Sequence, residues 1–126
     1  MQYSRELLFD GKARAIYAIR CRGRCEFIDF LEKLEREDQG SYDNIIAMLR
    51  RIAMYGPAQN EQQFRKCKDS DVYEIKSGRI RLFCFYAPKS QRLLLISHGW
   101  SKGLRKEQNQ EIQRAQRIYN DYRQQI

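Results

Sequence analysis

Residues 72–102 read VYEIKSGRIRLFCFYAPKSQRLLLISHGWSK, and their alternation of apolar and polar side chains predicts three antiparallel strands. The first two strands, 72–76 and 79–86, flank Ser77-Gly78, a dipeptide suited to a two-residue hairpin loop. Residues 92–98 form the most apolar run, which predicts a third strand near the centre of the sheet.

Counting outward from a Ser77-Gly78 loop predicts that Lys76 faces Arg79 and that Glu74 faces Arg81. One face of the hairpin then suits the core, with Tyr73, Ile75, Ile80 and Leu82. The opposite face gathers three cations and one carboxylate, and it continues into Phe83 and Phe85. Such a face can hold phosphates and stack a base. A plain solvated face with a cross-strand ion pair remains the alternative.

The flanking sequence predicts helices on both sides of these strands. Spacing of three and four predicts one helix over 25–35 and a second one that is capped by Ser41 and ends at Gly56-Pro57. A last helix over 107–122 has an apolar face that could dock on the sheet.

The expected fold is therefore α+β, in one domain over 1–126. A small antiparallel or mixed sheet is covered by an N-terminal helical hairpin, and a C-terminal helix follows. Residues 15–20 predict a first strand, and residues 1–14 form an N-terminal extension that could add another strand.

The net charge of +8 is concentrated in one part of the chain. Residues 76–106 contain eight Lys and Arg and no Asp or Glu, and the remaining 16 basic residues balance the 16 acidic ones. A localised excess of this kind is typical of a phosphate-binding surface. A solvated face or an acidic protein partner would also explain it.

Several other classes of protein find no support in the sequence. No segment has the roughly 18 apolar residues of a membrane span, and the charged N-terminus does not read as a signal peptide, so we expect a soluble cytoplasmic protein. Cys21, Cys25, Cys67 and Cys84 lack zinc-ligand spacing, which favours structural thiols. No nucleotide loop or paired-carboxylate site is present, and we expect neither a metal nor a cofactor.

Three segments carry a resemblance to a known family: Gly23-Arg24-Cys25-Glu26-Phe27 at a helix entry, residues 73–83, and His98-Gly99-Trp100-Ser101-Lys102 before the last helix. Together they resemble the HigB-like branch of the RelE/ParE toxin superfamily, which includes phage-derived members. The resemblance implies a RelE-like fold and a ribosome-dependent mRNA endonuclease that uses no metal. It also implies attack by a ribose 2′-hydroxyl on the adjacent phosphate, and inhibition by a cognate helix-turn-helix antitoxin.

Cleavage of this kind needs cations for the phosphorane charge and groups that move protons. The resemblance matches Lys76 and Arg81 to the family's basic strand residues, and Lys102 and Lys106 to its loop lysines. The chain departs from the family pattern with Lys76 for Arg, Gly103 for a second lysine and Gln108 for a common proline.

For catalysis we expect Arg81, Lys102 and His98. His98 is the only histidine and has an ordinary pKa of about 6.5, although it could instead turn into the core. The residues expected to contact RNA are Lys76, Arg79, Phe83, Arg105, Lys106 and Tyr122. Core packing is the alternative for Tyr122.

Two functions follow from these observations. The first is the toxin of a type II toxin–antitoxin system, acting on mRNA at the ribosome. The second is a non-catalytic RelE-like module of phage or mobile-element origin that binds RNA or protein through the same surface.

Overall fold

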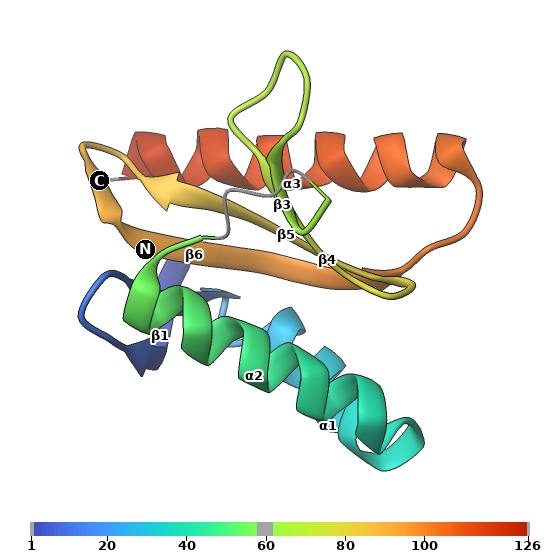
Figure 1. The fold of residues 1–126 in the computed structure, drawn as a ribbon. Coiled ribbons are helices and arrows are strands. Elements are labelled where there is room, and N and C mark those ends of the chain that lie inside the picture. Colours follow the sequence, from blue (N-terminus) through green and yellow to red (C-terminus); the bar gives the residue numbers. More distant parts are fainter. Residues whose placement is uncertain (1, 58–61, 126) are drawn as a thin grey trace.

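The computed structural model describes residues 2–57 and 62–125, within which six strands form one mixed sheet (Figure 1). The strand order is β1-β2-β6-β5-β4-β3, with β6 and β5 innermost. All neighbours are antiparallel except β2 and β6, which are parallel. The strands are β1 (Tyr3–Asp10), β2 (Ala15–Cys21), β3 (Phe64–Lys66), β4 (Tyr73–Ser77), β5 (Ile80–Ala87) and β6 (Ser90–Ser101). The predicted α+β class and the central place of the third strand are confirmed.

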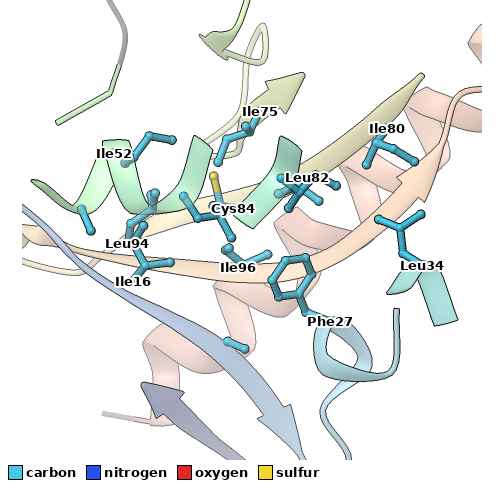
Figure 2. Packing of buried hydrophobic residues seen from close by; sticks show 14 of the residues in the cluster. Ile16, Phe27, Leu34, Ile52, Ile75, Ile80, Leu82, Cys84, Leu94 and Ile96 are labelled. Atoms are coloured by element: carbon cyan, nitrogen blue, oxygen red, sulfur yellow. The ribbon is translucent and has the colours of Figure 1, made fainter. Parts of the chain in front are cut away.

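Helices cover both faces of the sheet (Figure 1). The hairpin of α1 (Glu26–Glu37) and α2 (Gln39–Tyr55) packs on one face, and α3 (Arg105–Gln125) lies across the other. Figure 2 shows Phe27 and Ile52 of the hairpin beside Ile16, Leu82 and other strand residues of the larger core. The predicted helical hairpin and C-terminal helix are confirmed.

The start of α2 differs from the expectation. The helix begins at Gln39 and its N-cap is Asp38, whose carboxylate accepts hydrogen bonds from the Ser41 N–H (3.2 Å) and from the Ser41 hydroxyl (2.7 Å). The prediction of Ser41 as the cap is therefore wrong, because the carboxylate of Asp38, three residues earlier, already accepts a hydrogen bond from the Ser41 N–H at the start of the helix. Gly56 ends the helix with φ 88, as predicted.

The loop between β4 and β5 is Gly78-Arg79 rather than Ser77-Gly78. Gly78 has φ 59, and the first position of a type II′ loop requires such a positive φ. Lys76 therefore pairs with Arg81 and Glu74 with Phe83, so the pairs predicted from the other loop are wrong. The error displaces each partner by two residues, and a displacement of two keeps every side chain on its predicted face.

The second face of the hairpin is packed rather than solvated. Phe83 and Phe85 are completely buried beneath α3, and Tyr122 is 5% exposed against Phe85. Ala115 of α3 packs with Phe83 in a third cluster. The docking of α3 on the sheet thus closes the face that we expected to present aromatic rings to a base.

The N-terminal residues complete one edge of the sheet. β1 pairs antiparallel with β2, which confirms the extra strand expected within 1–14. The loop between them docks on α2, where the Ala53 carbonyl accepts from the N–H groups of Ala13 and Arg14, both at 2.9 Å. A Cβ on Gly11 would come within 2.2 Å of that carbonyl oxygen, so this approach requires glycine.

Candidate nucleic-acid interface

Four exposed cations surround the point where the β4–β5 loop meets the start of α3: Arg79, Lys102, Arg105 and Lys106, hereafter the cationic surface. Two hydrogen bonds join the first two residues. The Lys102 N–H donates to the Arg79 carbonyl at 2.7 Å, and the Arg79 guanidinium donates to the Lys102 carbonyl at 3.4 Å. Within 2–57 and 62–125, none of the four forms an ion pair, so their charges face solvent uncompensated.

One carboxylate lies beside the cationic surface without neutralising it. Glu107 Oε2 accepts a hydrogen bond from the Leu104 N–H at 3.2 Å, just before the helix begins. A carboxylate in this position accepts a hydrogen bond from a free backbone N–H group, and the positive end of the helix dipole stabilises its negative charge. It therefore fixes the start of α3, which carries Arg105 and Lys106.

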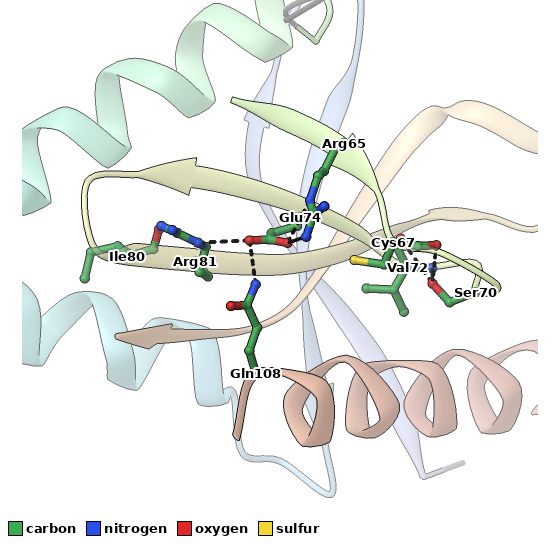
Figure 3. Close-up of polar contacts among 8 residues, drawn as sticks. All are labelled: Arg65, Cys67, Ser70, Val72, Glu74, Ile80, Arg81 and Gln108. Carbon is green, nitrogen blue, oxygen red and sulfur yellow. Dashed lines mark hydrogen bonds and ion pairs between the residues drawn. The ribbon is translucent and has the colours of Figure 1, made fainter. Parts of the chain in front are cut away.

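A buried polar cluster supports the cationic surface from below (Figure 3). The Glu74 side chain is completely buried, and its two oxygens lie 2.9 Å from Arg81 Nε and 3.1 Å from an Arg65 nitrogen. The Gln108 amide of α3 donates to the same carboxylate at 2.9 Å. Glu74 thus links β3, β4, β5 and α3.

The guanidinium of Arg81 is largely occupied within the fold. Its Nη1 donates to the carbonyls of Gly78 (2.7 Å) and Ile80 (3.0 Å), and its side chain is only 8% exposed. Its Nε lies 2.9 Å from Glu74 but is not aligned as a hydrogen bond to it. Arg81 therefore forms an ion pair with Glu74 although the two residues are not directly opposite in the sheet, and its bonds to the Gly78 and Ile80 carbonyls fix the backbone on both sides of Arg79.

A groove continues the cationic surface along one side of α3. It has a volume of about 590 Å³ and lies between that helix and the segment joining β3 to β4. Lys68 and Arg105 supply positive charge along it, together with Arg65, which is paired with Glu74, and Asp69 is the one acidic residue among the described residues of the lining. Gln108 and Asn109 supply amides. Cations beside hydrogen-bonding amides are typical of surfaces that follow a single nucleic-acid strand.

His98 lies in the core under α3, away from the cationic surface. Its side chain is 1% exposed, its Nδ1 is 2.8 Å from the Ser97 hydroxyl, and its Nε2 is 3.8 Å from a Glu111 oxygen. Burial, and to a smaller extent the nearby Arg114, lower the pKa of His98 to about 4 against the opposing effect of Glu26. The imidazole is therefore neutral at pH 7, in agreement with the structural alternative.

The predicted RNA-contacting residues divide into two groups. Arg79, Arg105 and Lys106 come together with Lys102 on the surface, whereas Phe83 and Tyr122 are buried beneath α3. Lys76 is half-buried, and its N–H donates to the Gln63 carbonyl next to β3. In this arrangement neither Phe83 nor Tyr122 offers a free ring face to a base.

Three residues of the interface were missed by reasoning from the sequence: Arg65, Lys68 and Gln108. The two cations precede the acid-free window and are interspersed with acidic residues, so the charge pattern does not single them out. β3 has only three residues, too few for an alternation to be visible. Its pairing with β4 is what brings Arg65 to Glu74.

The four cysteines are free thiols, and three of them are buried. Burial raises the pKa of Cys67 to about 11 and raises that of Cys84 as well, which disfavours the reactive thiolate. In the described part of the chain no three His, Cys, Asp or Glu side chains gather as metal ligands would. The same residues include no helix long and apolar enough to cross a membrane.

A family model described as "Phage derived protein Gp49-like (DUF891)" matches residues 29–120. The matched segment contains α2, the hairpin of β4 and β5, the whole cationic surface and most of α3. No curated protein matches the chain.

Proposed function

Because the chain belongs to the phage-derived Gp49-like family, which is related to the toxins of toxin–antitoxin systems, we propose that it is a toxin that cleaves mRNA. In this proposal the ribosome presents the mRNA, and a ribose 2′-hydroxyl attacks the adjacent phosphate in line. The 2′-hydroxyl loses its proton as the 2′-oxygen bonds to phosphorus, the bond from phosphorus to the 5′-oxygen of the next nucleotide breaks, and that oxygen leaves as a protonated hydroxyl, so the products are a 2′,3′-cyclic phosphate and a free 5′-hydroxyl. The cleavage uses no metal. A cognate helix-turn-helix antitoxin inhibits the enzyme by binding it.

The cationic surface is the observation that carries this proposal. In-line cleavage builds negative charge on a phosphorane, and fixed cations stabilise that charge in the transition state. Arg79 and Lys102 are exposed and joined to each other by hydrogen bonds, and they form no ion pair within the described residues. The adjoining groove provides a path for the flanking nucleotides.

The structure suggests a division of roles among the predicted catalytic residues. We assign the phosphorane charge to Lys102 together with Arg79, because both reach solvent. Arg81 acts as a positioning residue that holds the loop through the Gly78 and Ile80 carbonyls. His98 is assigned to the core, since burial separates it from any bound phosphate.

The test is inducible expression in bacteria, with growth curves and mapping of mRNA 5′ ends. Wild type should arrest growth and produce new 5′ ends, and an Arg79→Gln, Lys102→Gln double variant should do neither. A Lys33→Gln, Arg36→Gln double variant removes the same charge from the exposed side of α1 and should remain toxic. Arg81→Ala is a poor first choice, because loss of a buried ion pair would confuse misfolding with loss of catalysis.

The second candidate is a non-catalytic module that binds RNA through the same surface. It is favoured by the absence of an imidazole among the exposed groups beside the four cations, since His98 is the only histidine and is buried. If the wild-type protein is folded and abundant but does not arrest growth, and the transcripts stay intact, the endonuclease proposal is rejected. Charge-dependent RNA binding by that protein would then support the module.

A further inference from the structure

A second hollow lies next to α3, at the turn between β2 and α1. Its volume is about 380 Å³, within the range of small-molecule sites. The lining comes from both ends of the chain and from its middle: Tyr3, Ile19, Cys21, Arg22, Arg24, Glu26, Ser97, Arg114 and Ile118. It shares no residue with the groove beside the cationic surface.

The charge of this pocket is positive. Three arginines line it against a single carboxylate, Glu26, which forms a hydrogen-bonded ion pair with Arg114. The guanidinium groups of Arg22 and Arg24 have no hydrogen-bond or ion-pair partner within residues 2–57 and 62–125. Two arginines are therefore available to a ligand, and the third, Arg114, is shared with Glu26 and with Glu111, whose Oε1 lies 3.8 Å from Arg114 Nη1.

The backbone holds the two available arginines in a fixed turn. Cys21 and Arg24 exchange both backbone hydrogen bonds, at 2.7 and 2.9 Å, across a loop of Arg22 (φ 50) and Gly23 (φ 83). The Arg22 N–H also donates to the Gln2 carbonyl at 2.8 Å. A left-handed arginine persists only where its surroundings enforce it, so this loop presents its side chains from a defined backbone.

One wall of the pocket is apolar and the other is polar. Ile19 and Ile118 face the hollow from β2 and α3, and Tyr3 adds an aromatic ring. Ser97 supplies the hydroxyl that also contacts His98. An occupant that matches both walls has a strongly anionic group on a flat apolar body.

We propose that this pocket binds a nucleotide, with its phosphate held by Arg22, Arg24 and Arg114 and its base against Ile19 and Ile118. A phosphate monoester carries a charge of about −1.5 to −2 at pH 7, which balances three guanidinium groups and one carboxylate. Guanidinium groups also match phosphate oxygens in pairs. The nucleotide is either free or the phosphorylated end of an RNA.

The test is titration of the purified full chain with adenosine 5′-monophosphate, adenosine, inorganic phosphate and a 5′-phosphorylated RNA octamer. Calorimetry gives the affinities, and amide chemical shifts locate the ligand. We expect the monophosphate to bind more tightly than adenosine or phosphate alone and to shift the amides of residues 22–26. Binding of the octamer alone, with the same shifts, would identify the RNA end as the source.

Matched variants distinguish ligand binding at this pocket from nonspecific electrostatic attraction to a basic protein. Arg22→Gln with Arg24→Gln should weaken monophosphate binding by about tenfold or more, since each charged contact contributes more than about 1 kcal/mol. Lys33→Gln with Arg36→Gln should leave it unchanged. Glu26→Gln should tighten binding, because it removes one of the two carboxylates that pair with Arg114 while keeping the side-chain shape.

Three results would overturn the proposal. The first is no binding of either the monophosphate or the octamer at residues 22–26. The second is equal weakening by the two double variants, and the third is weaker binding by Glu26→Gln when its circular dichroism matches wild type. Equal affinity for inorganic phosphate and the monophosphate would reject the apolar wall as a base site.

Discussion

The carboxylate of Glu74 lies between two arginines, of which Arg81 is nearly buried and Arg65 is partly exposed. The Arg81 side chain is 8% exposed, so removal of its partner leaves a nearly buried charge without compensation. We expect Glu74→Gln to lower the free energy of unfolding by about 3 kcal/mol, measured by urea denaturation. Glu6→Gln breaks an exposed pair with Arg20 and should cost less than about 1 kcal/mol. Equal losses in the two variants would contradict the role given to Glu74.

His98 gives the stability of the protein a dependence on pH. Its folded pKa of about 4 lies below its ordinary value of about 6.5, so the unfolded chain binds the extra proton between these two values. The contribution of neutral His98 is therefore complete above pH 6.5 and decreases by about 1.4 kcal/mol per pH unit as the pH falls towards 4.

His98→Asn removes this titration and keeps a polar partner for Ser97. The difference in unfolding free energy between wild type and variant should narrow as the pH is lowered from 6.5 to 4. Urea denaturation at intervals of half a pH unit measures that difference. A constant difference across this range would show that the imidazole does not titrate as its burial requires.

Individual residue roles were the hardest to predict from the sequence. Burial is a property of contacts that form between distant segments, so nothing local to His98 reveals that α3 covers it. The same holds for Phe83. It lies on the predicted face of the hairpin, but it is completely buried where we expected an exposed ring. Arg79, Lys102, Arg105 and Lys106 could be identified because they lie in the acid-free window 76–106 and because Lys and Arg side chains are mostly exposed in folded proteins.

Two glycines in different elements should respond in opposite directions to the same substitution. On β6 a Cβ at Gly99 would lie 2.5 Å from the Phe30 ring of α1, so Gly99→Ala should destabilise the fold by about 1–3 kcal/mol. In the first turn of α2, Gly40 has only the Asp38 carboxylate near its Cβ position, at 3.8 Å, so Gly40→Ala should stabilise by about 0.5 kcal/mol. Thermal denaturation distinguishes the signs, and a neutral Gly99→Ala would mean that α1 can shift on the sheet.

Elements with strong periodicity were predicted well. α1, α2, β5, β6 and α3 all follow apolar spacing that extends over many residues, so an error at one position does not alter the pattern. Loop and cap positions were predicted less well, because single hydrogen bonds decide them. The choice between Ser77-Gly78 and Gly78-Arg79 depends on one backbone angle, and the choice between Ser41 and Asp38 on one acceptor.

The uneven charge of the whole molecule should control its affinity for RNA. Each phosphate contact on a single strand contributes about 0.7 to the slope of log affinity against log salt concentration. Lys102→Gln with Lys106→Gln should therefore reduce that slope by about 1.4, measured by fluorescence anisotropy with a labelled RNA octamer. Lys33→Gln with Arg36→Gln, on the far helical layer, should leave the slope unchanged. An identical reduction in both double variants would point to a diffuse charge effect.

The parallel pairing of β2 with β6 also determines when the sheet can fold while the protein is being synthesised. This pairing places Ala15 beside Leu93, so the centre of the sheet forms only after most of the chain has left the ribosome. Arg79 and Lys102 meet only once β6 has joined β5. A nascent or prematurely terminated chain that ends before Ser101 therefore has Arg79 but lacks Lys102, Arg105 and Lys106, so the cationic surface arises only after the end of β6 and the start of α3 have been synthesised.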